Sequence, residues 1–399
     1  PAALLSLGEL TYLNLGENRL AEIPTGIGQL AKLQELHLRK NQLQSLPDTL
    51  WDLQELTTLY VWGNQLSEIP EAIGQLTKLQ KLELSQNQLQ ALPAALLSLG
   101  ELTYLNLGEN PLAEIPTGIG QLAKLQELYL FKNQLKSLPD TLWDLRELMT
   151  LYVWGNQLSE IPEAIGQLTK LQKLGLSQNQ LQALPAALCS LVELTYLNLG
   201  ENRLAEIPTG IGQLAKLQEL GLQKNQLKTL PNSIWELHAL IELGLDDYQL
   251  DQNKEKVEAL SRLQRLLLVQ DRLPELPSVL WKLYKLQELS FLGSKKLTHI
   301  SIEIGNLAHL RELVLSATPL SIEEINSALH HLPQIENLYL RNLGLTELPQ
   351  SVYELKNLKK LILKNRDDSQ AYNGTPTNNF SEEEQAKIKA LLPGVDIEF

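Results

Sequence analysis

The stretch LQELHLRKNQLQSLPDTLWDLQE, from Leu33 to Glu55, contains a pattern of apolar residues that recurs along most of the chain. Its skeleton reads L-x-x-L-x-L-x-x-N-x-L-x-x-L-P-x-x-I-x-x-L-x-x. The skeleton begins again at Leu56, Leu79, Leu102, Leu125, Leu148, Leu171, Leu194 and Leu217. A fixed period of 23 residues predicts a solenoid, in which each repeat is one structural unit and neighbouring repeats stack.

Each repeat opens with a short predicted strand. At the start of the quoted stretch, leucine alternates with other residues, which is the period typical of a strand. Leu36 and Leu38 therefore point to the side that becomes the core. Glu35, His37 and Arg39 point to the opposite side, which we expect to face solvent. One repeat cannot bury its own leucines, so its neighbours must cover them.

The rest of the repeat predicts a turn and a return segment. The Asn41 amide both donates and accepts hydrogen bonds, so stacked asparagines can satisfy turn backbone groups that have no strand partner. Pro47 ends the turn because it requires an extended residue before it. Leu50 and Leu53 then bury one side of a short 3₁₀ or irregular segment. We expect a row of tryptophans on this outer side to be partly buried by packing: Trp51, Trp143, Trp235 and Trp281.

These repeats resemble the leucine-rich repeat (LRR), in the 23-residue form that carries L/I-P and I-G-x-L, over roughly residues 1–365. They are similar to those of bacterial LRR proteins, of the LRR regions of Roco GTPases and of intracellular Ras-group LRR scaffolds. The resemblance implies a right-handed α/β solenoid, a horseshoe with a parallel sheet on its concave side. It also implies short 3₁₀ or helical segments on the convex side, a C-terminal cap of a helix and a strand, and non-enzymatic binding of a protein on the concave face.

Regular repeats occupy residues 1–239, and a longer period lies on top of the shorter one. Residues 1–92, the first cassette, reappear as residues 93–184, the second cassette, with seven substitutions. Duplication of a four-repeat cassette is the simplest account, and an engineered or trimmed array is the alternative. No leucine of the skeleton changes, and several changes fall on the predicted strand face: Arg19/Pro111, His37/Tyr129, Arg39/Phe131, Gln44/Lys136, Gln54/Arg146, Thr57/Met149 and Glu83/Gly175.

Irregular repeats are predicted over residues 240–363. In the segment SIEEINSALHHL, Ser321 and Glu324 form a capping box, which predicts a helix. Other residues take the place of the recurring asparagine here: Tyr248, Asp271, Ser294, Thr318 and Leu343.

The end of the chain has a different composition. Residues 364–380 are polar and rich in turn formers, so we expect a solvated loop. Residues 381–399 predict the cap: Ser381 and Glu384 open a helix, and a last short strand follows at 395–399. Because the chain begins inside a repeat and finishes at this cap, we expect further residues upstream of Pro1 and no domain after Phe399.

Composition excludes several classes of function. The net charge of −13 and the pI of about 5.1 disfavour nucleic-acid binding and anionic membranes. No run of about 18 apolar residues predicts a membrane span. The single cysteine, Cys189, reads as a small apolar residue and excludes an internal disulfide, which favours an intracellular or bacterial protein, although a secreted or surface location stays open. No phosphate loop, metal-ligand spacing or nucleophile motif is present, so we expect neither a cofactor nor catalysis.

Aromatic residues gather at outward strand positions, and these are the candidate binding residues. Two adjacent strands carry the densest group, with one more tyrosine on the strand before: Tyr129, Phe131, Tyr152, Trp154 and Tyr104. The first cassette has a related patch, in which we expect an Arg39–Trp62 contact: His37, Arg39, Tyr60 and Trp62. Exposed aromatic clusters are typical of protein interfaces. The alternative is that these rings only stabilise the sheet through cross-strand pairs.

Three rival functions remain beside a protein-binding module. One is a surface or secreted bacterial adhesin or effector that binds host protein or glycan, since Trp62 and Trp154 could stack on sugars. A second is the scaffold region of a larger signalling protein. The third, an enzyme, is disfavoured by the absence of any catalytic motif.

Overall fold

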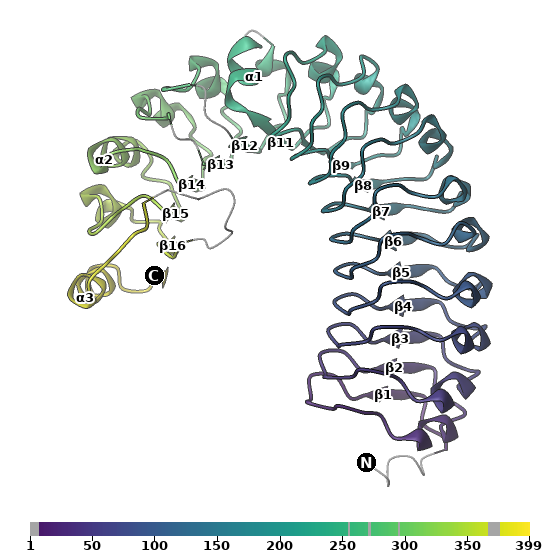
Figure 1. Cartoon of the computed structure of the whole chain (residues 1–399). Coiled ribbons are helices and arrows are strands. Elements are labelled where there is room, and N and C mark those ends of the chain that lie inside the picture. The colour runs from purple at the N-terminus through teal and green to yellow at the C-terminus, as the bar shows by residue number, and fades with distance from the viewer. Residues whose placement is uncertain (1–7, 254–255, 270–272, 294–295, 366–375) are drawn as a thin grey trace. The chain divides into compact units, whose positions relative to one another are not determined.

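Short parallel strands and 3₁₀ segments alternate along the chain, as the sequence predicts (Figure 1). This computed structural model describes residues 8–253, 256–269, 273–293, 296–365 and 376–399. The chain forms two units by its internal contacts. The first unit holds residues 1–198 and 202–204, and the second holds residues 199–201 and 205–399.

In the first unit, each strand pairs in parallel with the strand of the next repeat. The register advances without a slip, so that Leu13 lies beside Leu36 and Leu36 beside Leu59. Leu36 and Leu38 are fully buried, which confirms their predicted direction. The strands are β1 (Tyr12–Asn14), β2 (Glu35–His37), β3 (Thr58–Tyr60), β4 (Lys81–Glu83), β5 (Tyr104–Asn106), β6 (Glu127–Tyr129), β7 (Thr150–Tyr152), β8 (Lys173–Gly175) and β9 (Tyr196–Asn198).

The return segments of the first unit are 3₁₀ helices, as predicted. Pro47 precedes one of them in an extended conformation, with φ −68° and ψ 144°. These segments are η2 (Thr25–Gln29), η3 (Asp48–Asp52), η4 (Glu71–Gln75), η5 (Ala94–Ser98), η6 (Ile119–Gln121), η7 (Asp140–Asp144), η8 (Glu163–Gln167) and η9 (Ala186–Ser190).

The row of tryptophans is buried more deeply than expected. Trp51 and Trp143 are each 1% exposed, and in the second unit Trp235 and Trp281 are 5% and 3% exposed. The prediction of partial burial was wrong because neighbouring repeats enclose a ring that a single repeat would leave at its edge. Cys189 is also buried, in agreement with its reading as a small apolar residue.

The 3₁₀ segments of the first unit approach one another two by two, a feature that the sequence analysis did not predict. A Cβ on Gly28 would lie 2.4 Å from the carbonyl oxygen of Thr49, so only glycine fits there. Gly120 meets Thr141 in the same way, at 2.4 Å. The η4–η5 pair lies between these two: a Cβ on Gly74 of η4 would lie 2.9 Å from the Cβ of Ala95 in η5, and the Glu71 carboxylate of η4 accepts hydrogen bonds from the first backbone N–H groups of η5. Glycine in every second repeat therefore sets a structural period of two repeats.

The recurring asparagines form the predicted ladder. The Asn64 Nδ2 donates to the carbonyl oxygens of Leu38 and Val61, at 3.0 and 2.8 Å. Its Oδ1 accepts from the backbone N–H of Leu43 at 3.1 Å. Asn64 is 8% exposed, and it thereby connects the turns of neighbouring repeats from inside the stack. The same bonds recur at Asn41, Asn87, Asn110, Asn133, Asn156 and Asn179.

The strands of the second unit also pair in parallel, and the described residues of this unit include three α-helices. Its strands are β10 (Glu219–Gly221), β11 (Glu242–Asp246), β12 (Arg265–Val269), β13 (Glu288–Leu292), β14 (Glu312–Ser316), β15 (Asn337–Arg341), β16 (Lys360–Ile362) and β17 (Asp396–Glu398), of which β11 to β15 have five residues each. Its 3₁₀ segments are η10 (Ile211–Gln213), η11 (Asn232–Glu236), η12 (Val257–Ala259), η13 (Ser278–Lys282), η14 (Ile302–Asn306) and η15 (Gln350–Glu354). Its helices are α1 (Asp247–Gln252), α2 (Ile322–His330) and α3 (Glu382–Leu391).

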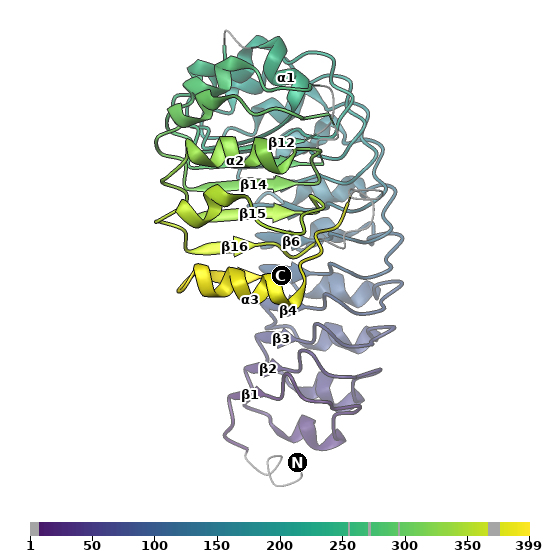
Figure 2. The same ribbon diagram turned by 90° about the vertical axis from the view of Figure 1, so that its left-hand side faces the viewer.

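Both predicted capping boxes open helices in the second unit. The Ser321 hydroxyl accepts from the Glu324 N–H at 3.2 Å, and Ser381 accepts from Glu384 at 3.1 Å. Figure 2 shows α3 beyond β16, at the C-terminal end of this unit. The strand that follows α3 pairs in parallel with β16, which confirms the predicted helix–strand cap.

Asn378 restores the asparagine ladder where the repeats have lost it. Its Nδ2 donates to Leu340 and Leu363, and its Oδ1 accepts from the backbone N–H groups of Leu343 and Leu345. The prediction of a solvated loop was wrong for this residue, which is 9% exposed, because its amide bonds to a turn 35 residues earlier in the chain. Two predicted ladder replacements, Asp271 and Ser294, lie outside the described residues.

We expect Asn64→Ala to destabilise the chain by about 2 kcal/mol or more. The substitution removes the hydrogen bonds that the Asn64 amide makes to the buried Leu38 carbonyl oxygen and Leu43 N–H. Chemical denaturation followed by circular dichroism measures this. The control is Gln65→Ala, which removes an exposed side chain next to the ladder. Equal unfolding midpoints for the two variants would show that the ladder does not stabilise the fold.

Candidate functional site

The side chains that alternate with the buried leucines form what we call the open strand face, the surface of the sheet opposite the leucine core. In the first unit this face carries a row of tyrosines, Tyr104, Tyr129, Tyr152 and Tyr196. Neighbouring ring centroids in this row lie 5.4, 5.5 and 5.8 Å apart. All four rings are partly exposed.

A second row lies beside the first. Phe131 and Trp154 stack with an interplanar angle of 5° and a centroid distance of 5.0 Å. The Lys132 ammonium, from the same turn as Phe131, lies over the Trp154 ring at 5.3 Å. The structure thus brings the predicted residues Tyr104, Tyr129, Phe131, Tyr152 and Trp154 together, and we call these five residues with Tyr196 the aromatic patch.

Two glycines leave room for these rings close to the sheet backbone. A Cβ on Gly108 would lie 2.5 Å from the Cζ of Phe131. A Cβ on Gly175 would lie 2.7 Å from the Cδ1 of Tyr152, which reaches across this position to Tyr196. Sequence analysis missed the contribution of Tyr196. The signal was the substitution of Gly175 for the equivalent Glu83, which removes the side chain between the two rings.

Carboxylates orient the phenols of the patch. The Tyr129 hydroxyl donates to Glu127 at 2.5 Å, and the Tyr104 hydroxyl donates to Glu83 at 2.8 Å. Burial raises the pKa of both phenols well above the usual value, and the same carboxylates raise the pKa further. Both phenols therefore stay protonated at neutral pH.

The related patch of the first cassette differs from the expectation in two ways. His37 is 9% exposed rather than solvated, because the rings of Tyr12 and Tyr60 flank it at 5.1 and 4.7 Å. The cation over the Trp62 ring is Lys40, at 5.1 Å, whereas Arg39 pairs with Glu17. Lys40 occupies this place because the residue before each ladder asparagine turns with positive φ, here 49°.

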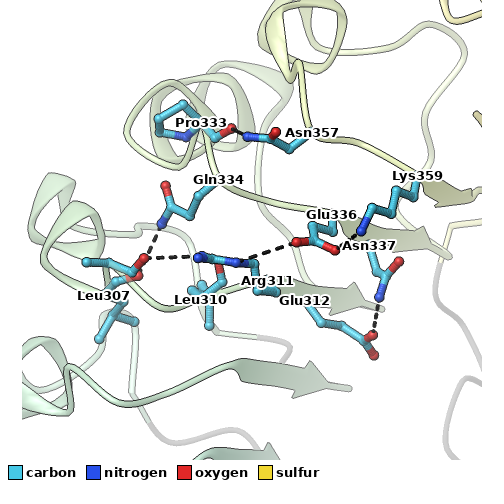
Figure 3. A network of polar contacts seen from close by, with 11 residues as sticks. Leu307, Leu310, Arg311, Glu312, Pro333, Gln334, Glu336, Asn337, Asn357 and Lys359 are labelled. Carbon is cyan, nitrogen blue, oxygen red and sulfur yellow. Dashed lines mark hydrogen bonds and ion pairs between the residues drawn. The ribbon is translucent and has the colours of Figure 1, made fainter.

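The open strand face of the second unit carries a polar groove. This groove of about 450 Å³ is lined by charged and amide side chains that include Arg265, Glu288, Arg311, Glu312 and Asn337. Burial raises the pKa of Glu312, while a hydrogen bond from Asn337 opposes this shift. Figure 3 shows the adjoining network, in which Arg311 and Lys359 both pair with Glu336. Sequence analysis did not single out this groove, although its residues occupy the first outward position of successive strands and the position before it.

A metal site requires several ligating side chains close together, and a membrane-spanning helix requires a long apolar run. The described residues contain no group of three His, Cys, Asp or Glu side chains placed to hold a metal ion. None of their helices is both long and apolar enough to cross a membrane. The open strand face of the first unit offers an aromatic surface on a hydrogen-bonded sheet.

We expect His37 to make stability dependent on pH. Burial lowers the pKa of His37, so the folded chain favours the neutral imidazole, and protonation favours unfolding. The stabilising contribution is present above the unfolded pKa of about 6.5 and is lost as pH falls through the lower folded value. His37→Tyr introduces the equivalent residue of the second cassette and removes this titration.

Thermal unfolding between pH 7.5 and 5 compares the two chains. The unmodified chain should lose more of its midpoint temperature than His37→Tyr across this interval. Parallel curves would show that His37 is not buried as a neutral ring. The remaining histidines are common to both chains and cancel in the comparison.

The sequence and the fold both match a known family. A family model described as a leucine-rich repeat region matches residues 2–103, 93–186 and 177–301. Comparison with curated proteins finds no match.

Solved structures give the same answer. An LRR protein of Leptospira interrogans is 32% identical with a TM-score of 0.63, over 100% of this chain and 86% of that chain. The plant peptide hormone receptor RGFR1, solved in complex with RGF2, is 26% identical with a TM-score of 0.60, over 94% of this chain and 66% of that chain. The functional domain of InlJ from Listeria monocytogenes shares the fold, at 21% identity and a TM-score of 0.65, over 89% and 73% of the two chains. The chain therefore belongs to the leucine-rich repeat family.

Proposed function

We propose that the chain is a non-enzymatic protein-binding module that uses the aromatic patch of its first unit. The observation that carries this proposal is the Phe131–Trp154 stack beside the tyrosine row, partly exposed on a paired sheet. Tyrosine and tryptophan supply large contact areas at low conformational cost and dominate many protein interfaces. A surface fixed in advance loses little entropy when a partner binds.

The two cassettes support binding over stabilisation as the role of these rings. A pair of stacked or edge-on rings contributes about 0.5–1.5 kcal/mol to a fold, so the rings do stabilise the sheet to some extent. The first cassette, however, builds the same strands with His37 and Arg39 where the second has Tyr129 and Phe131. Tyr129 and Phe131 are therefore not required for the fold, and contact with a partner accounts for their exposed position.

The relatives are consistent with this role. The plant receptor RGFR1 was solved in complex with RGF2, and it shares 26% identity with this chain. On this proposal, Tyr129, Phe131, Tyr152 and Trp154 are the central anchors and Tyr104 borders them. The first-cassette residues Tyr60, Trp62 and Arg39 extend the contact, and His37 packs between the rings of Tyr12 and Tyr60.

The double variant Tyr152→Ala/Trp154→Ala tests the proposal. It removes one ring from each aromatic row, and we expect it to weaken partner binding about 30-fold or more, which corresponds to ~2 kcal/mol. The immobilised chain captures proteins from cell lysate and from host-cell surface extract. Binding constants of a captured protein are then measured for both purified chains.

The matched control is Tyr284→Ala/Ile302→Ala, which removes two large apolar side chains exposed by 58% and 60% in the second unit. This control should bind like the unmodified chain. If the Tyr152/Trp154 variant binds normally while its unfolding midpoint falls sharply, the rings stabilise the sheet and the proposal is wrong. A captured glycan in place of a protein would favour the adhesin alternative.

A further inference from the structure

One outward position distinguishes the tyrosine rows of the two cassettes. At β8 this position is Gly175, and the rings of Tyr152 and Tyr196 meet across it at 5.8 Å. At β4 the same position is Glu83, which lies beside Tyr60 on β3 and Asn106 on β5, and the Tyr104 hydroxyl of β5 reaches its carboxylate diagonally. Glu83 of the first cassette thus places a carboxylate between the phenols of Tyr60 and Tyr104, whereas at Gly175 of the second cassette the rings of Tyr152 and Tyr196 meet directly.

Neutral donors hold this carboxylate in place. Glu83 Oε2 accepts from the Tyr104 hydroxyl and from Asn106 Nδ2, both at 2.8 Å. Glu83 Oε1 accepts from the Ser85 N–H at 3.0 Å. A carboxylate offers about four acceptor positions, so one remains on Oε1.

The charge of Glu83 has no cationic partner among the residues that the structure describes. Glu83 is 9% exposed, and no Lys, Arg or His nitrogen of the described residues lies within 4.0 Å of its carboxylate oxygens. Lys81, two residues earlier on the same strand, is exposed. Burial and then the carboxylates of Glu83, Glu35 and Glu127 raise the pKa of Tyr60, which reflects the negative potential at this position.

We propose that Glu83, with the rings of Tyr60 and Tyr104 on either side, receives a lysine or arginine side chain of the bound protein. This inference rests on the proposed function and specifies part of its partner. A cation near aromatic faces is attracted by the rings, and the partly desolvated carboxylate gives it a charge-assisted hydrogen bond. Closing the partner over Glu83 excludes water and strengthens this bond. The partner then presents a cationic group to the first cassette and apolar groups to the aromatic patch.

A small cationic peptide tests the Glu83 site separately from the rest of the surface. The probe is a five-residue glycine peptide that carries two arginines, and its control is the same peptide with citrulline in place of arginine. Titration calorimetry at low ionic strength measures both against the unmodified chain, Glu83→Gln and Glu83→Gly. Glu83→Gln keeps the shape of the side chain, and Glu83→Gly is the native arrangement of the second cassette, so a folded variant is assured by one or the other.

We expect the arginine peptide to bind the Glu83 variants about tenfold more weakly than the unmodified chain. The citrulline peptide should bind weakly to all three chains. Glu114→Gln makes the same change of charge at an exposed position away from the strands and should have no effect. Gly175→Glu should add a second site and raise the stoichiometry.

Equal binding of the arginine peptide to Glu83→Gln and to the unmodified chain would overturn the inference, as would no binding to the unmodified chain at millimolar peptide. Binding of the captured protein to the Glu83 variants and to the Tyr152/Trp154 variant distinguishes a failure of this inference from a failure of the proposed function. If binding of the captured protein depends on Tyr152 and Trp154 but not on Glu83, the inference about Glu83 is wrong and the proposed function stands. If binding depends on none of these residues, both are wrong.

Discussion

Each turn of this solenoid leaves backbone groups that its own strand cannot satisfy, and in the regular repeats one buried asparagine per repeat bonds to such groups of its own turn and of the turn before it. Asn64 bonds at once to its own turn, to Leu38 in the repeat before it and to the backbone N–H of Leu43. Because the amide must reach the turn of the preceding repeat as well as its own, the repeat length is fixed and the strands advance in register. Where the second unit has lost the asparagine at Leu343, Asn378 supplies the same amide from a distant part of the chain.

The residues that set the fold are not those of the open strand face, so the residues of that face can vary. The leucines and asparagines point inward and set the fold, so outward residues can change with little effect on packing. The first and second cassettes show the result at three outward positions, where His37, Arg39 and Glu83 correspond to Tyr129, Phe131 and Gly175. One backbone thereby presents a mixed polar and aromatic surface in the first cassette and a continuous aromatic patch in the second.

Sequence predicted what depends on local pattern. The strands, the 3₁₀ segments, the ladder and the capping boxes at Ser321 and Ser381 follow from residue type and spacing within one repeat. The depth of burial of His37 and Trp51 could not be predicted from one repeat, because it depends on the side chains of neighbouring repeats. The ladder role of Asn378 also could not be read from spacing, since a loop brings it back to an earlier turn. The aromatic neighbours Tyr129 and Tyr152 were predictable because a fixed register places equivalent positions side by side.

We propose that the inward skeleton determines the fold while the aromatic patch determines recognition. The most direct measurement exchanges Tyr129→His and Phe131→Arg together, which transfers residues of the first cassette to the second. Unfolding and binding of a captured protein are then measured on the same sample. The account predicts a nearly unchanged unfolding midpoint and a large loss of binding. A large fall in the midpoint with unchanged binding would contradict it.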